Sequence, residues 1–417
     1  MTLVKEYLEY TKHYKVLYGT KTLVLMEVGS FYECYAIKKA EGVYEGSDIL
    51  DFTQINDMII ANKNTCVDEQ NIVMAGFGVT QLDKYVRKML LHGYTIVVYI
   101  QDKQAAKTTR SLGCIYSPGT YFDNNDYYSQ GGATESLSNN TMCIWIHYSK
   151  KNRIVKEDMI TLGLTLIDII TGKLVSYEYT INYSNSPTTY DQLEKYISIY
   201  NPCELIIITN KNSQNGEHSH FIDDVISYAN INSAKIHKVY LLEDEDTNTN
   251  TNTNTNTNTN ITSFETIAKN CEKQLYQETL IDKIYGAGSY RGKSEFQNYS
   301  VANQSLCFLL VFIEKHNPAL IKAIDYPHFE NINNQLILAN HSLKQLNMIS
   351  DQRYNGKLGC VANFLNNTIT NAGRRKFAYD LLHPINNIAS LNASYDVTQE
   401  LIDTKFYKII RCKVCKF

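Results

Sequence analysis

The stretch Thr22-Leu23-Val24-Leu25-Met26-Glu27-Val28-Gly29-Ser30-Phe31-Tyr32-Glu33-Cys34-Tyr35 decides the fold of the first part of the chain. Its apolar run, residues 22–28, predicts a strand, and Gly29-Ser30 is a turn signal. The aromatic cluster of residues 31–35 follows directly. If the chain stays extended after the turn, Phe31 and Glu33 point to the same side, because side chains alternate along a strand.

The residues around this stretch predict a mixed α/β segment over residues 1–122. Apolar side chains at spacings of three and four predict a helix over 3–17. A second helix is predicted over 80–92, where Gly93 ends it, and an apolar strand over 94–100 comes next.

A second mixed segment is predicted over residues 137–242. Successive strand-like runs with a turn at Thr171-Gly172 predict a β-meander over residues 142–179. A helix over 191–200 and a buried strand over 205–208 complete this α/β unit.

Residues 243–262 are of low complexity and divide the chain. An acidic run is followed by seven consecutive Thr-Asn pairs over 247–260. Such a segment has almost no apolar surface to bury and does not offset its ordering entropy, so we predict a flexible linker. Beyond it, residues 263–417 are predicted to be helical, with the periodic runs 264–283, 302–316 and 391–410.

Charge and cysteine content limit the classes of function. The 417 residues carry 40 basic and 43 acidic side chains, a formal charge of −3, so any nucleic-acid surface must be local. The ten cysteines have no regular spacing, which is typical of reduced thiols. The one close pair, Cys412 and Cys415, lacks a second pair at zinc-site spacing, so we expect no metal site.

The chain has no feature of a membrane or secreted protein. No apolar run approaches the roughly 18 residues of a spanning helix. The start of the sequence lacks the features of a signal peptide. We therefore expect an intracellular protein without a membrane partner, with nucleus, cytoplasm and viral factory all open. The 32 tyrosines and the Thr-Asn tract are typical of an A/T-rich coding sequence, such as that of a large DNA virus.

Several motifs carry a resemblance to one family. Met26 to Glu33 resembles the mismatch-reading motif of the MutS mismatch-repair family, Gly-x-Phe-Tyr-Glu after a hydrophobic strand. Further stretches resemble MutS motifs in the same order along the chain: Met74-Ala75-Gly76-Phe77-Gly78, His92-Gly93-Tyr94 leading to Gln101, Arg110 followed by Ser117-Pro118-Gly119-Thr120, Gly163 to Gly172, Asn201-Pro202-Cys203-Glu204-Leu205, Leu343 to Asn347, Leu358 to Arg375, and His383-Pro384-Ile385. The resemblance extends from about residue 26 to residue 385. Within the family, the chain resembles giant-virus or organelle-type homologues.

The resemblance implies three domains and two site residues. It implies a mixed α/β mismatch-binding domain over 1–122, an RNase H-like α/β connector over 137–242, and the start of a helical core, or lever, domain over 263–417. Phe31 is then the wedge that stacks on a mispaired base, and Glu33 hydrogen-bonds that base. The partner implied is double-stranded DNA with mispaired or unpaired bases.

The sequence also departs from the family pattern. Gly78 stands where the family has proline, Ile100 where it has glutamate, and Ser394 near the place of an arginine. The ATPase region of the family, with its ATP and Mg²⁺, is not matched. We therefore expect no catalytic residue, cofactor or metal in the 417 residues. The ATPase activity of the family would then come from an ATPase-bearing MutS-like chain or a dimer partner.

Two alternatives stay open. The chain is either a mismatch binder or a truncated remnant that serves as an interaction module, since a single wedge domain contacts few phosphates. A nucleotide-hydrolysing enzyme is the third and weakest interpretation. Gly286 to Ser294 nearly spells a P-loop, but Gly286 lies one position too early before Gly292-Lys293-Ser294. We interpret this segment as a loop.

Overall fold

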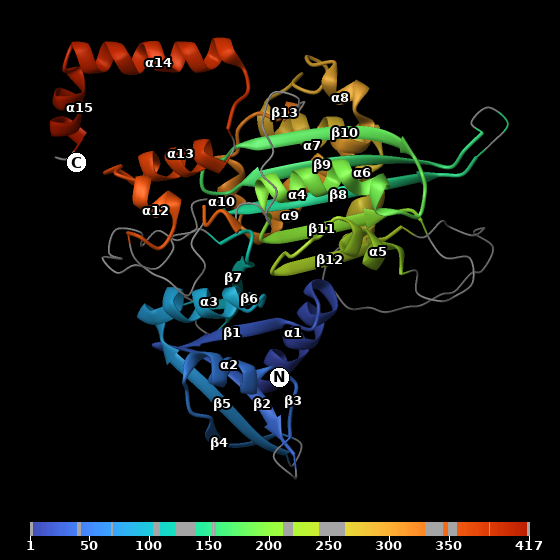
Figure 1. The fold of residues 1–417 in the computed structure, drawn as a ribbon. Helices are drawn as coiled ribbons and strands as arrows, with labels where there is room; N and C mark the ends of the chain where they lie inside the picture. Colours follow the sequence, from blue (N-terminus) through green and yellow to red (C-terminus); the bar gives the residue numbers. More distant parts are fainter. Residues whose placement is uncertain are drawn as a thin grey trace.

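The computed structural model consists of two lobes, each built on one sheet, and a set of helices at the C-terminal end (Figure 1). The predicted linker, 243–262, lies outside the described residues, and so does most of the loop after residue 121. The structure describes residues 3–39, 43–67, 70–102, 109–121, 139–151, 153, 156–211, 220–241, 263–329, 345–348, 357–382 and 384–414.

The first lobe contains a seven-stranded sheet in the order β4-β5-β2-β1-β6-β7, with β3 paired to β2. Only the central β1–β6 pair is parallel. The strands are β1 (Thr22–Val28), β2 (Phe31–Lys38), β3 (Tyr44–Glu45), β4 (Ala61–Val67), β5 (Gln70–Gly78), β6 (Thr95–Gln101) and β7 (Arg110–Tyr116). The helices are α1 (Leu3–Tyr18), α2 (Ile49–Asn56) and α3 (Leu82–Leu91).

The apolar run that predicted the first strand is buried in the centre of this sheet. Residues 23–26 of β1 are at most 1% exposed, because β2 and β6 flank the strand and α1 packs on it. The Tyr7 side chain of α1 reaches over β1 and donates a hydrogen bond to the Val24 carbonyl (3.1 Å). The predicted helices and strands of this segment are therefore confirmed. They include the helix that ends before Gly93, and Gly93 has φ +77°.

The second lobe contains a six-stranded sheet in the order β12-β11-β8-β9-β10-β13. The β8–β9 and β9–β10 pairs are antiparallel, as the meander predicted, and the remaining pairs are parallel. The strands are β8 (Asn140–Ser149), β9 (Met159–Asp168), β10 (Leu174–Asn182), β11 (Glu204–Thr209), β12 (Lys235–Tyr240) and β13 (His328–Phe329).

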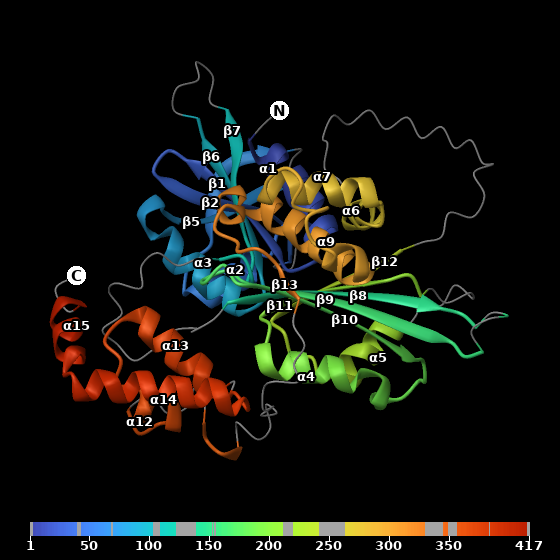
Figure 2. The same ribbon diagram turned by 90° about the horizontal axis from the view of Figure 1, so that it is seen from above.

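Helices cover both faces of the second sheet (Figure 2). One face packs on α4 (Asp191–Tyr200) and α5 (Phe221–Tyr228). The other face packs on a group of helices that follows the low-complexity segment, with α9 crossing β8 and β9. These helices are α6 (Phe264–Cys271), α7 (Gln274–Tyr285), α8 (Glu295–Asn298), α9 (Ser300–His316) and α10 (Pro318–Ile321).

The packing of α9 on the second sheet affects the predicted domain boundary at residue 263. Phe308 and Phe312 of α9 share a hydrophobic core with Trp145 of β8 and Ile167 of β9. Residues on both sides of the low-complexity segment therefore form one core, and the strand β13 extends the same sheet. The helical region predicted from 263 onwards begins as a layer on the second sheet.

Two of the predicted helices are divided. The run 264–283 forms α6 and α7, which are separated at Glu272-Lys273. The run 391–410 falls on α14 (Ile388–Asp403) and α15 (Phe406–Val414), where Lys405 adopts φ +55°. Periodicity continues through such a break because it reports apolar spacing and not backbone geometry.

In Figure 1 the C-terminal helices lie beside the second lobe. They comprise α12 (Val361–Leu365), α13 (Asn371–Leu382), α14 and α15. Among the described residues α14 buries none, and Tyr395, Val397 and Ile402 are more than half exposed.

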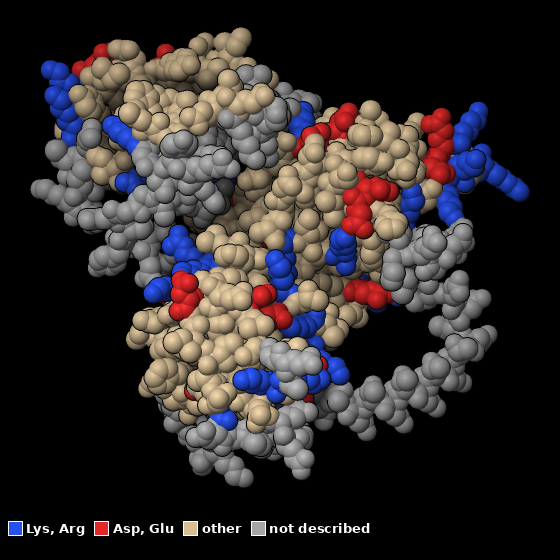
Figure 3. Space-filling view, turned by 60° about the horizontal axis from the view of Figure 1, so that its bottom comes forward, with Lys and Arg blue, Asp and Glu red and all other residues tan. Residues whose placement is uncertain are grey.

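Two further observations concern hydropathy and surface charge. Among the described residues, no helix is long and apolar enough to cross a membrane. On the face drawn in Figure 3, basic and acidic side chains are interspersed over both lobes.

Candidate nucleic-acid interface

A braced turn presents Phe31 at the end of the first sheet. Gly29 adopts φ +63°, and its N–H donates to Oε1 of Gln101 (3.0 Å). The backbone N–H of Gln101 donates in turn to Oε2 of Glu27 (3.0 Å), and Nε of Arg110 donates to the Glu27 carbonyl (2.8 Å). The turn between β1 and β2 is therefore tied to β6 and β7, which makes it a rigid mount.

Phe31 is the first residue of β2 and is 53% exposed. Its register partners are Val28 on β1 and Gly78 on β5. The next residue, Tyr32, points to the other face, is 5% exposed and packs against Phe77. Tyr32 is therefore a core residue, whereas Phe31 is an apolar ring whose exposure carries a solvation cost.

Glu33 lies two residues further along β2, on the same side of the strand as Phe31. Its register partner on β5 is Gly76. A Cβ atom at Gly76 would lie 2.7 Å from the Tyr32 carbonyl oxygen and 3.1 Å from Cγ of Glu33. The glycine therefore leaves the space in which the Glu33 side chain lies, and that side chain is only 11% exposed.

Two donors hold the Glu33 carboxylate. The Tyr35 hydroxyl donates a short hydrogen bond to Oε2, and Nζ of Lys63 forms an ion pair with the same oxygen (3.2 Å). Nζ of Lys63 also donates to the Tyr35 hydroxyl oxygen (2.9 Å) and lies 4.2 Å from the centre of its ring. Burial, together with the hydrogen bond to Glu33, raises the pKa of Tyr35, which keeps the phenol protonated.

The structure thus brings Phe31 and Glu33 together, and it adds partners that the sequence reasoning missed. Tyr35 packs edge-on against Tyr7 in the core (ring centroids 5.2 Å), and its hydroxyl donates a hydrogen bond to Glu33. The alternation of residues 31, 33 and 35 along one strand could have indicated this bond. Lys63 comes from β4, and no local signal connects it with Glu33.

A second buried polar group joins the two lobes. Glu204 begins β11, and its Oε2 accepts hydrogen bonds from the Ser117 hydroxyl and from the Gly119 N–H (2.9 Å). Its Oε1 accepts from Nε2 of His237 (2.8 Å). Burial tends to raise the pKa of Glu204, but the hydrogen bond and charge of His237 outweigh it and lower the pKa to about 2. Two motifs with family resemblance, at 117–120 and 201–205, therefore meet at this junction.

The P-loop-like segment has a different context from a phosphate site. It follows the helix α7 and not a strand. The N–H groups of Gly288 and Tyr290 donate to the Asp282 carboxylate (both 3.0 Å), and the Lys293 ammonium lies 4.0 Å from the centre of the Tyr326 ring. A carboxylate occupies the place that a phosphate would need, so the interpretation of this segment as a loop is confirmed.

No metal site appears in the part of the chain that the structure describes. Cys415 lies outside the described residues, and nothing is described of the Cys412 side chain.

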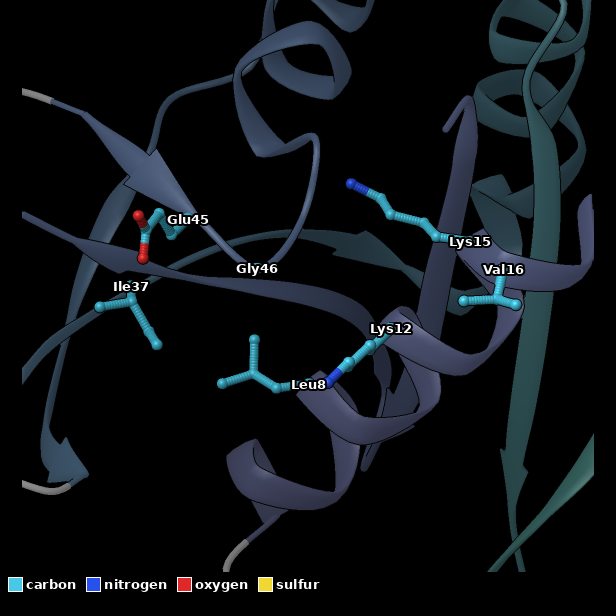
Figure 4. A pocket seen from close by; sticks show the side chains of 7 residues that line it. All are labelled: Leu8, Lys12, Lys15, Val16, Ile37, Glu45 and Gly46. Atoms are coloured by element: carbon cyan, nitrogen blue, oxygen red, sulfur yellow. The ribbon is translucent and has the colours of Figure 1, made fainter. Parts of the chain in front are cut away.

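One hollow in the first lobe is lined by neither Phe31 nor Glu33. It has a volume of about 490 Å³ between α1 and the strands β2 and β3. Figure 4 shows the α1 side chains on one side and those of the two strands on the other. Two of its charged groups are paired, Lys15 with Asp48 (2.7 Å) and Glu45 with Lys39 (2.5 Å).

Comparison with known proteins defines the class of the first lobe. Residues 2–125 match the family model described as MutS domain I. The similarity to MutS homologues continues over nearly the whole length of the chain.

Three relatives illustrate this similarity. A DNA mismatch repair protein mutS homolog of Acanthamoeba polyphaga mimivirus is 26% identical over 99% of this chain and 36% of its own length. The mitochondrial mutS homolog of Sarcophyton glaucum is 23% identical over 99% of this chain and 42% of its own length. The MutS of Clostridioides difficile is 21% identical over 96% of this chain and 34% of its own length. The chain thus spans less than half the length of these relatives.

Proposed function

We propose that this protein binds DNA at mispaired or unpaired bases in mismatch repair. The observation that carries the proposal is the exposed Phe31 ring on a braced turn, with the Glu33 carboxylate two residues along the same strand face. An apolar ring inserted between base steps unstacks and kinks a duplex at a cost of roughly a few kcal/mol per step. A mispaired step deforms more cheaply than a paired one, so this cost favours lesions.

Each segment has a role in this proposal. Residues 1–122 are the mismatch-binding domain, 137–242 the RNase H-like connector and 243–262 a linker. Of the predicted helical core, 263–417, the part up to β13 packs on the connector sheet, so the proposal begins the separate helical core after β13. The proposal places ATP, Mg²⁺ and the ATPase of the family outside these residues, in a continuation of the chain, a second MutS-like chain or a dimer partner.

A binding comparison tests the proposal. The 417-residue protein is titrated with a duplex containing one G·T mismatch and with the same duplex fully paired, at fixed salt. We expect tighter binding to the mismatched duplex and loss of that preference in Phe31→Ala. Phe406→Ala is the matched control, because Phe406 is 49% exposed on α15 and lies outside the proposed site.

Two results would reject the proposal. Equal binding to both duplexes, or an unchanged preference in Phe31→Ala, favours the alternative of a remnant that acts as an interaction module.

A further inference from the structure

The turn that carries Phe31 is held from both sides. On one side, the Gly29 N–H donates to Oε1 of Gln101 at the end of β6 (3.0 Å). On the other side, the Ser30 carbonyl accepts the N–H of Val79, the first residue after β5 (3.0 Å). Each of the two residues before Phe31 is therefore bonded to a different neighbour of the β1–β2 pair.

A second set of hydrogen bonds fixes the end of β1 to β6 and β7. The backbone N–H of Gln101 donates to Oε2 of Glu27 (3.0 Å), and Nε of Arg110 donates to the Glu27 carbonyl (2.8 Å). Glu27 is only 3% exposed, so water cannot readily replace either donor. The side chain of Gln101 thus holds the turn, while its backbone and Arg110 hold the strand that leads into the turn.

An irregularity in β7 places Arg110 where it can do this. The register between β6 and β7 shifts by one residue between Val98 and Tyr99, so that Arg110 lies opposite Gln101. Without the shift, Ser111 would lie there. The contact with β1 crosses β6, about two strand spacings of 4.7–4.9 Å, which an arginine side chain can span and a serine hydroxyl cannot. Such bulges commonly redirect a side chain beside a functional site.

The rigidity of the turn affects one kind of DNA complex more than another. Only a complex in which the Phe31 ring is inserted between bases needs the turn in a single position. If the turn were loose, it would have to be ordered on insertion, and that entropic cost would weaken this complex alone. A paired duplex bound without insertion would keep its affinity. The bonds to the turn therefore act on the ratio of the two affinities.

We propose that Gln101 and Arg110 are positioning residues for Phe31, and that they determine how strongly the protein prefers mismatched over paired DNA. This inference rests on the proposed function. Gln101 acts through Gly29, and Arg110 acts through the Glu27 backbone. Neither residue has to contact a base.

Gln101→Met tests the inference, because it keeps the length of the side chain and removes the acceptor. The full chain is titrated with a duplex that carries one G·T mismatch beside 2-aminopurine, and with the same duplex fully paired, at fixed salt. We expect the preference for the mismatch to fall about two- to tenfold, the range of one lost hydrogen bond, with unchanged affinity for the paired duplex. The fluorescence rise at saturation, which reports unstacking of 2-aminopurine, should be smaller than in the wild type.

Two further variants complete this comparison. Gln101→Glu keeps an acceptor for the Gly29 N–H and should retain the wild-type ratio, since its added charge weakens both duplexes alike. Gln297→Ala, at an exposed position on α8, is the matched control and should change neither the ratio nor the fluorescence.

The other bonds are tested from different strands. Arg110→Met removes the donor to the Glu27 carbonyl, and Val79→Pro removes the N–H that bonds Ser30. Proline suits this position, because Val79 begins a short 3-10 helix and Gly78 before it is extended (φ −64°, ψ 142°). Both variants should lower the ratio in the same direction as Gln101→Met, and urea unfolding measures whether each is folded.

Several outcomes would overturn the inference. One is an unchanged ratio and fluorescence in folded Gln101→Met while Phe31→Ala abolishes the preference, a result that leaves the proposed function intact. Another is a loss in Gln101→Glu as large as that in Gln101→Met, because the acceptor would then be irrelevant. Equal weakening of both duplexes by Arg110→Met, with a smaller salt dependence, would make Arg110 a phosphate contact. The proposed function fails separately, if the wild-type chain binds both duplexes alike.

Discussion

At the scale of single residues, the candidate site depends on one position without a side chain. Gly76 and Gly78 lie on the same strand, β5, opposite Glu33 and Phe31 respectively. Only Gly76 is crowded, because a Cβ atom there would contact a backbone oxygen and the Glu33 side chain, whereas Gly78 has open space. The two glycines therefore form a natural pair for comparison.

We expect Gly76→Ala to lower the free energy of unfolding by about 1–3 kcal/mol, the usual cost of forcing an extra carbon into a packed site. Because Glu33 must move, the preference for mismatched DNA should fall as well. Urea unfolding and duplex titration measure the two effects. Gly78→Ala is the control and should change neither; equal effects of the two substitutions would contradict this account of the site.

At the scale of elements, Glu204 connects the exit of β7 with the start of β11. The Glu204 carboxylate accepts hydrogen bonds from residues 117–119, which follow the first sheet, and from His237 on β12. The carboxylate is fully buried, so its hydrogen bonds must be kept for the two sheets to stay in place.

Glu204→Gln should lower the free energy of unfolding by about 1–3 kcal/mol, because the amide has one acceptor oxygen where the carboxylate has two, and a buried N–H or O–H donor is left without a partner. Chemical denaturation at pH 7 measures this loss. Glu157→Gln, at an exposed position before β9, is the control with an expected change near zero. A loss for Glu204→Gln no greater than that of the control would show that the contacts at this junction contribute nothing to stability.

At the scale of the whole molecule, His316 connects α9 of the second lobe with α1 of the first. Its ring lies 5.1 Å from the Tyr18 ring and 4.1 Å from the Phe312 ring. Nδ1 donates to the Phe312 carbonyl (2.8 Å), and Nε2 is buried without a partner in the described residues. Burial lowers the pKa of His316 to about 4, even though the Glu204 charge opposes this shift.

This pKa predicts acid sensitivity of the folded state. The ordinary pKa of histidine, about 6.5, applies to His316 in the unfolded chain. As the pH falls below this value, His316 binds a proton in the unfolded chain but stays neutral in the folded protein, so stability is lost between pH 6.5 and pH 4. At about 1.4 kcal/mol per pKa unit, the contribution is roughly 3 kcal/mol. Denaturant unfolding across this range should show it, and His316→Gln should flatten the slope. The same slope in both proteins would contradict the prediction.

Local pattern alone predicted much of the first sheet and the core of the site. The apolar run of β1, the glycine turn and the alternation of Phe31 with Glu33 are properties of neighbouring residues, so they are readable without a fold. The division of the run 264–283 into two helices was not readable, because the break is a change in backbone direction within an unbroken apolar spacing.

The sequence by itself determined which ring and which carboxylate share a strand face, and which segments are too polar to fold. Only the tertiary structure decided their surroundings. Lys63 reaches Glu33 from 30 residues away, and Ser117 meets Glu204 across 87 residues. The physical reason is that strand alternation acts between adjacent residues, whereas a buried charge finds its partner through the order in which strands pair, and that order is a property of the whole sheet.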